Sequence, residues 1–202
     1  MKSRMLLGAI VLLALVTVAS GQQTTYKWDI AFANGPDNVV NGISAGGSAT
    51  AYYFIGSQSP EITFTGSGTF KSCKGLAALI CPFFVTGGGT WTDGTTSGTY
   101  VVTELISFDV AALPFSLPTD NIGNAANARG GTAILKIHYS DGSQGILVLE
   151  GLLVVGGTLQ TGVSASKGLA LYPAQHSVGC IDGFCFEPGA VFPIFHVIAC
   201  GN

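Results

Sequence analysis

Short runs of Val, Ile, Thr, Tyr and Phe follow one another along most of this 202-residue chain. Glycine, proline or an Asp-Gly step interrupts them about every ten residues, which is typical of strands joined by turns. Apolar residues at helical spacing are nearly absent, and only residues 75–80 and 124–129 hold a weak helical pattern. The pattern predicts an all-β fold with strands at residues 26–33, 49–55, 61–71, 83–92, 99–110, 132–139, 145–155, 169–172 and 192–199.

The clearest local element is a hairpin around Asp141-Gly142, because these residue types accept the positive φ angles of a tight turn. A simple register for this hairpin places Glu150 on the face opposite Lys136 and His138. Several glycines mark bulges at which a sheet can curl; those in or beside the predicted strands are Gly66, Gly68, Gly87, Gly88, Gly89, Gly94 and Gly98. We therefore predict a single antiparallel β-barrel-like domain, with a β-sandwich as the alternative.

The first 21 residues differ from the rest of the chain. Lys2 and Arg4 precede an almost uninterrupted apolar stretch over residues 5–19, and the small residues Ser20 and Gly21 follow it. A basic start, an apolar stretch of about 7 to 15 residues and a small-residue exit are the marks of a secretory signal peptide. We predict that residues 1–21 are removed, that residues 22–202 form one domain, and that the protein is secreted and extracellular.

Charged residues are scarce. They make up 9% of the chain, the net charge is −3, and glycine occurs 29 times. Without the leader, the chain has six basic and eleven acidic residues, and the basic ones are scattered. This composition argues against nucleic acid as a partner and, after cleavage, against a membrane. A surface of Ser, Thr, Asn, Gln and Gly suits neutral material. The candidate partners are a neutral polysaccharide or a small apolar ligand, and the sequence leaves monomer and dimer open.

Five cysteines follow the leader, and secreted proteins use this residue mainly in disulfides. The shortest loops pair Cys73 with Cys81 and Cys180 with Cys185. Cys200 is then free or available for a bond between two chains, and a bond between Cys185 and Cys200 is the nearest alternative. Neither short spacing matches a zinc site.

Two patterns are candidates for catalysis. Glu104 and Glu150 each interrupt an apolar strand, and two carboxylates that face one cavity serve as acid and base in glycoside hydrolysis. Residues 42–46 match the Gly-x-Ser-x-Gly pattern of a nucleophilic serine, which requires a helix to follow. Because another strand pattern follows here, a flexible Gly/Ser loop is the simpler interpretation.

The remaining candidates concern ligands. The three histidines, His138, His176 and His196, lie far apart, so we predict no metal site and expect hydrogen-bonded structural roles for His138 and His196. No phosphate loop or dinucleotide motif follows a strand, so we predict no cofactor. Trp91 and Tyr100 are candidate aromatic contacts for a sugar or an apolar ligand, with core packing as the alternative.

Four segments carry a shared pattern of glycines and strand residues: GGGTWT at 87–92, GTYVVTELISF at 98–108, IHYSDGSQG at 137–145 and GVSASKG at 162–168. This pattern resembles small secreted proteins of fungi, especially mushroom-forming ones. The resemblance implies a fungal source and secretion, and it supplies no catalytic residues. The glycine placement is also similar to that of the dirigent and allene oxide cyclase barrels.

We therefore expect a secreted, non-enzymatic protein with an extracellular binding or structural role at a cell wall, a host surface or a small apolar ligand. The alternative is a barrel enzyme, either a carboxylate-based glycoside hydrolase or a cyclase-like protein, that uses Glu104 and Glu150. The position of these two residues separates the hypotheses, because glycoside hydrolysis needs carboxyl groups about 5 to 10 Å apart in one open cavity.

Overall fold

A computed structural model describes residues 23–35, 40–52, 61–73, 84–113, 116–155, 158–173 and 189–201. Nearly all of these residues lie in β-strands, which confirms the all-β prediction. The weak helical pattern at 124–129 corresponds to a single 3-10 turn, η2 (Ala125–Asn127). The predicted leader at 1–21 and the second helical pattern at 75–80 lie outside the described residues.

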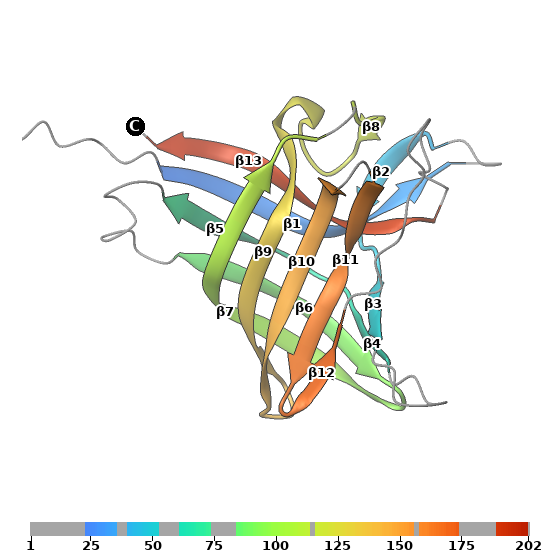
Figure 1. Ribbon diagram of the computed structural model, residues 1–202, viewed down its shortest axis with the longest axis vertical. Helices are drawn as coiled ribbons and strands as arrows, with labels where there is room; N and C mark the ends of the chain where they lie inside the picture. Colours follow the sequence, from blue (N-terminus) through green and yellow to red (C-terminus); the bar gives the residue numbers. More distant parts are fainter. Residues whose placement is uncertain are drawn as a thin grey trace, which may run out of the picture.

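Six antiparallel strands close into a barrel, as predicted, and the sandwich alternative does not describe this closure (Figure 1). In ring order they are β1 (Gln23–Asn34), β5 (Ser67–Cys73), β6 (Val85–Asp93), β7 (Thr96–Ala111), β9 (Ala128–Tyr139) and β13 (Val191–Gly201). Closure leaves no free edge within this ring, so each of the six strands has a hydrogen-bonded neighbour on both sides.

Further strands extend the sheet on two sides of the ring. β4 (Glu61–Phe64) and β3 (Ala49–Tyr52) continue from β6, whereas β10 (Gln144–Val155), β11 (Thr158–Lys167) and β12 (Ala170–Tyr172) continue from β9. The two extensions meet, because the Tyr52 amide donates to the Pro173 carbonyl at 3.2 Å and the Tyr172 hydroxyl to the Asp93 carboxylate at 2.9 Å. Strand β2 (Gly42–Ala45) pairs with β1, and β8 (Thr119–Asp120) pairs with β2.

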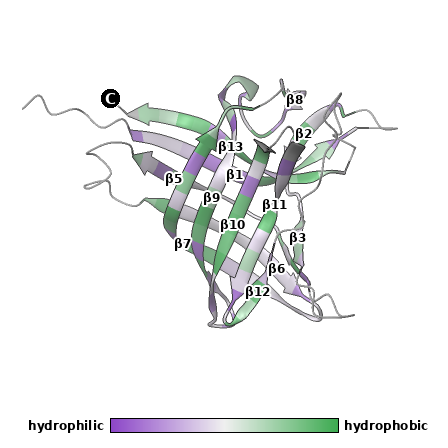
Figure 2. Ribbon diagram, in the orientation of Figure 1, coloured by the Kyte–Doolittle hydropathy of each residue, from purple (hydrophilic) through white to green (hydrophobic). Residues whose placement is uncertain are grey.

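Aromatic side chains fill the barrel interior. The Phe108 ring centroid lies 4.7 Å from that of Tyr26, 4.7 Å from that of Phe70 and 4.8 Å from that of Phe195. Hydrophobic bands run through β9 and β10 in Figure 2, where alternate residues such as Leu135 are fully buried. Burial of these rings contributes the largest favourable part of the folding free energy.

One of the predicted glycine bulges shows why the sheet curls here. Gly87 has a φ of 125°, and a Cβ atom at this position would lie 2.5 Å from the Ser67 carbonyl and 2.9 Å from the Trp28 ring. A larger residue would therefore be strained and would push β5 and Trp28 away. The predicted strand at 61–71 bends in the same region, and it forms β4 and β5 on either side of residues 65–66.

The Asp141-Gly142 turn is confirmed, with a Gly142 φ of 88° and a 2.6 Å ion pair between Asp141 and Lys167. The predicted register of this hairpin is wrong. Glu150 pairs with Thr132 and Ile146 with Lys136, so Glu150 shares a face with Lys136. The five residues between the paired His138 and Gln144 form an odd-numbered loop, and an odd loop reverses the side-chain faces relative to an even one.

A second, smaller core lies on the outside of the barrel. The outward residues of β1 and β13 are apolar here, and the described parts of the connection between β7 and β9, residues 112–113 and 116–127, pack over them through Leu113, Leu117 and Ile122. Its buried members are Ala31, Ala33, Ile43, Ala128, Leu152, Phe192 and Ile194. Among the described residues, this side of the barrel therefore has a layer that the opposite strands lack.

Candidate functional site

Hydroxyl side chains line the outer face of β3, β4, β6 and β7. Three segments of the form Thr/Ser-x-Thr place two hydroxyls each on this face, because alternate residues of a strand point the same way. Their register aligns them across the strands in two rows. We call this surface the threonine face: Thr50, Thr63, Thr92 and Ser97 form the first row, and Thr65, Thr90 and Thr99 form the second.

Hydrogen bonds between neighbouring hydroxyls order the threonine face. The Oγ1 atoms of Thr50 and Thr63 lie 2.8 Å apart, and those of Thr65 and Thr90 lie 2.7 Å apart. Sheet geometry spaces such groups about 4.8 Å apart across strands and about 6.7 Å apart along a strand. Each hydroxyl has one donor and two acceptor sites, so a paired hydroxyl keeps hydrogen-bonding capacity for a ligand.

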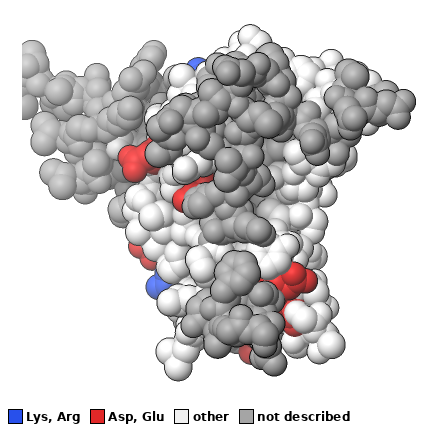
Figure 3. Space-filling view, turned by 45° about the vertical axis from the view of Figure 1, so that its right-hand side comes forward, with Lys and Arg blue, Asp and Glu red and all other residues white. Residues whose placement is uncertain are grey.

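The threonine face contains no charged residue. Glu61 pairs with Tyr52 beyond the first row and lies at the edge of the threonine face. Among the described residues visible in Figure 3, acidic and basic side chains are few. A ligand on this face is therefore met by dipoles and methyl groups and not by ions.

The two predicted ligand aromatics lie beneath this surface and not on it. Trp91 is 1% exposed and Tyr100 is 2% exposed. The Trp91 indole donates to the Thr99 carbonyl at 3.2 Å, the Tyr100 hydroxyl donates to the Thr65 carbonyl at 3.0 Å, and burial raises the pKa of Tyr100. Both rings belong to the core, so neither can contact a surface polymer. The period-two pattern that exposes Thr90 and Thr92 also buries Trp91.

The structure does not bring Glu104 and Glu150 together. Glu104 on β7 pairs with Lys136, whereas Glu150 on β10 pairs with Thr132. Lys136 and Thr132 are four residues apart on β9, a separation of about 13 Å along the strand. Both glutamates alternate with the inward Leu105 and Leu149, so they do not share the barrel interior. This arrangement lacks the carboxyl pair of a glycoside hydrolase.

Ser44, the centre of the Gly-x-Ser-x-Gly pattern, lies in β2 and not in the flexible loop that we predicted. Its hydroxyl accepts hydrogen bonds from the side-chain amides of Asn34 at 2.7 Å and Asn121 at 3.3 Å. A nucleophilic serine needs a base that accepts its proton, and two amide donors do not provide one. Pairing with β1 overrides the local preference of this glycine-rich segment for a loop.

A buried polar cluster fixes the β7–β9 connection to β13. The His196 Nε2 atom lies 2.6 Å from the Asp120 carboxylate, and both side chains are 2% exposed. Burial alone would raise the pKa of Asp120, but hydrogen bonds from His196 and from the amides of Ile122 and Gly123 outweigh burial and lower it. The structural role predicted for His196 is confirmed.

Asp29 belongs to the same cluster, but its pKa shifts in the opposite direction to that of Asp120. It is 2% exposed, and burial raises its pKa although Lys27 lies 3.2 Å away. His138 is exposed on β9, and His176 lies outside the described residues. No group of three metal-ligating side chains occurs in the described part of the chain.

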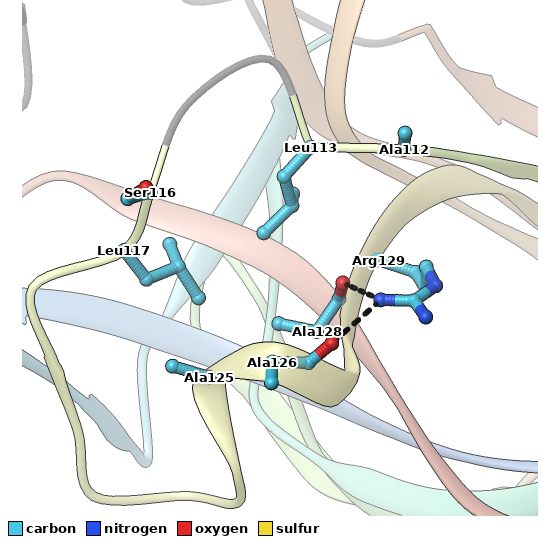
Figure 4. A pocket seen from close by; sticks show the side chains of 8 residues that line it. All are labelled: Ala112, Leu113, Ser116, Leu117, Ala125, Ala126, Ala128 and Arg129. Carbon is cyan, nitrogen blue, oxygen red and sulfur yellow. Dashed lines mark hydrogen bonds between the residues drawn. The ribbon is translucent and has the colours of Figure 1, made fainter.

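A pocket of about 370 Å³ lies between the two limbs of the β7–β9 connection (Figure 4). Leu113 and Leu117 point into this space from one limb, and small alanines of η2 and of the start of β9 form the opposite side. Arg129 lies at the border, where its Nη1 donates to the carbonyls of Ala126 at 3.1 Å and Ala128 at 2.7 Å. Nothing in the local sequence around Arg129 signals this pocket.

Most of the predicted disulfide framework falls outside the described residues. Cys73 ends β5, whereas Cys81, Cys180 and Cys185 lie in segments that the structure does not describe. Both predicted pairings therefore stay predictions. Cys200 is an exposed free thiol near the end of β13.

No protein-family model, curated protein or solved structure matches this chain. Among the described residues, no helix is both long enough and apolar enough to cross a bilayer. Within the described residues, the threonine face and the pocket at Arg129 are candidate sites.

Proposed function

We propose that this protein is a secreted, non-enzymatic binding protein whose threonine face lies against a neutral, hydroxyl-rich polysaccharide. The observation that carries the proposal is the register of Thr/Ser-x-Thr segments on neighbouring strands, which gives two rows of uncharged hydroxyls. A polysaccharide chain presents the complementary surface, since its repeating hydroxyls both donate and accept hydrogen bonds.

The chemistry of threonine supports this partner. Its branched side chain has restricted χ1 freedom, and the hydrogen bond between Thr65 and Thr90 restricts it further. Binding therefore costs little side-chain conformational entropy. A neutral sugar carries no charge for an ionic group to pair with, and a charged residue would lose part of its hydration on contact. The partly exposed ring of Tyr52 at the edge of the face adds an apolar contact for a sugar ring.

Each hydroxyl contact is weak, because protein–sugar hydrogen bonds replace bonds to water. A single sugar is therefore a poor ligand, whereas an insoluble polymer offers many equivalent positions along each chain. We expect retention on a polymer and little affinity for its monosaccharide.

The test is a pull-down of the purified protein on insoluble chitin, β-1,3-glucan and cellulose. The protein should be retained on one of these polymers, and the double variant Thr63→Lys/Thr90→Lys should reduce retention at least about 10-fold by placing two ammonium groups on the face. Thr119→Lys and Asn127→Lys together add the same charge at exposed positions on the opposite side and should leave retention unchanged.

Equal retention of the double variant and its charge-matched control would contradict the proposal, as would the absence of retention on all three polymers. Circular dichroism of each variant provides the control for folding, since both substitutions in the threonine face are at outward positions of the sheet.

A further inference from the structure

The pocket at Arg129 exists because two paired strands separate. β7 and β9 stay paired, with two register shifts, as far as Ala111 and Gly130, and the described chain between them then folds back over the outside of β1 and β13. The two limbs of this connection do not close against each other, since η2 presents only alanine methyl groups to Leu113 and Leu117. The resulting space of about 370 Å³ is at the lower end of the range of small-ligand sites, which is about 300 to 1,000 Å³.

The walls of the pocket are already in place without a ligand. Leu113 and Leu117 pack against the second core, and Ala128 is 3% exposed in that core. A ligand chain would therefore meet Leu113, Leu117 and Ala128 in positions that packing already fixes. A preformed site of this kind binds without the free-energy loss of ordering its own walls.

Arg129 supplies a fixed positive charge at the border of this space, whose lining combines leucine and alanine side chains with polar groups (Figure 4). Two backbone carbonyls hold its Nη1 atom, and no carboxylate lies within 4 Å of it among the described residues. Lys27 and Lys167, by contrast, each have an aspartate partner. Arg129 is also the one arginine of the described chain, and the protein as a whole is acidic. A guanidinium in this setting keeps several N–H donors for an anion.

We propose that this pocket binds a small amphipathic carboxylate, with the carboxylate on Arg129 and an aliphatic chain between Leu113, Leu117 and the alanines. Charge complementarity selects the anionic head group, because a guanidinium repels an ammonium group and gains less from an alcohol. The small volume selects a short chain. This site is on the side of the barrel opposite the threonine face and does not depend on the function proposed for that face.

Isothermal titration calorimetry with octanoate, octanol and octylamine tests the proposal. The wild-type protein should bind octanoate at least about 10-fold more tightly than octanol, and octylamine more weakly still. Arg129→Gln should abolish the preference for octanoate over octanol, whereas Lys136→Gln removes a charge elsewhere on β9 and should retain it. Ala126→Trp, an exposed position at the pocket wall, should abolish binding of both compounds by filling the space.

Because Arg129→Gln also removes two hydrogen bonds to the backbone, Arg129→Lys serves as a second variant that keeps the charge. It should retain part of the preference for octanoate, and circular dichroism should show the fold of all variants. Absence of octanoate binding, equal binding of octanoate and octanol, or unchanged octanoate binding by Ala126→Trp would each overturn the proposal. The Ala126→Trp variant should still be retained on the polysaccharide. This pull-down tests the threonine face alone, so it distinguishes a failure of the pocket proposal from a failure of the proposed function.

Discussion

Two sides of the same barrel use their outward residues differently. At the threonine face, the outward positions of β4, β6 and the first part of β7 hold threonine and serine, and the described chain leaves them uncovered. On β1 and β13 the outward positions include Ala31, Phe192 and Ile194, and the β7–β9 connection covers them. On both sides the pleat of the strands turns alternate side chains outward. Apolar outward residues therefore favour a second layer, since their burial is favourable and that of hydroxyl groups is not.

The two sides also differ in how they satisfy polar groups. The threonine face uses neutral hydroxyl pairs at the surface, whereas the covered side buries Asp29, Asp120 and His196. A buried ion needs a partner far more than a surface hydroxyl does. Substitutions on the covered side should therefore change stability, and substitutions on the threonine face should change binding.

The largest effect is expected in the second core. Ile194→Ala removes a side chain that is 0% exposed and should lower the free energy of unfolding by about 2 to 5 kcal/mol. Thr92→Ala on the threonine face should change it by less than about 0.5 kcal/mol, because this side chain is exposed. Urea denaturation of both variants measures the difference. Equal losses would show that the β7–β9 connection adds no separate core.

An intermediate effect is expected from the buried pair of Asp120 and His196. Asp120→Asn weakens a charge-assisted hydrogen bond in a buried site and should lower the free energy of unfolding by about 1 to 3 kcal/mol at pH 7. Asp109→Asn, at an exposed position of β7, is the matched control and should have little effect. A loss no larger than that of the control would mean that the pair does not hold the connection in place.

The pH dependence of this effect follows from the direction of each pKa shift. The pKa of Asp120 is lowered, so its contribution is present above the unfolded pKa of about 3.9 and is lost as the pH falls through the folded value. The pKa of Asp29 is raised, so the stabilisation linked to its protonated form is lost as the pH rises through the folded value. Urea titrations between pH 2 and 7 should show a weaker loss of stability in acid for Asp120→Asn and a stronger loss for Asp29→Asn. Identical pH profiles for the two variants would contradict these assignments.

The smallest effect is expected within the threonine face. A double-mutant cycle of Thr65→Val and Thr90→Val should give a coupling energy of about 0.2 to 1 kcal/mol, because their hydroxyls lie 2.7 Å apart. Thr50→Val and Thr90→Val lie in different rows and provide the control, for which we expect no measurable coupling. Similar couplings in the two cycles would mean that the face is not organised by specific pairs.

Strand positions and the curled sheet could be predicted because they depend on local patterns. Alternating Thr and aromatic residues in 90–92 and the Asp141-Gly142 turn each specify a local geometry without a partner. Three strands escaped prediction for the opposite reason. β2 and β8 are short, and β11 contains few apolar residues, so these strands form because neighbouring strands offer unpaired backbone groups.

By itself, the sequence determined the fold class, the tendency to curl and the low content of charged residues, since these follow from residue type and spacing over a few positions. Tertiary structure alone decided that Trp91 and Tyr100 lie in the core, that Glu104 and Glu150 lie apart, and that Asp120 meets His196. It also placed Arg129 beside Leu113. These outcomes depend on strand register and on the path of the β7–β9 connection, both of which are fixed by long-range pairing. A shift of one residue in the register would turn each side chain of a strand to the other face of the sheet.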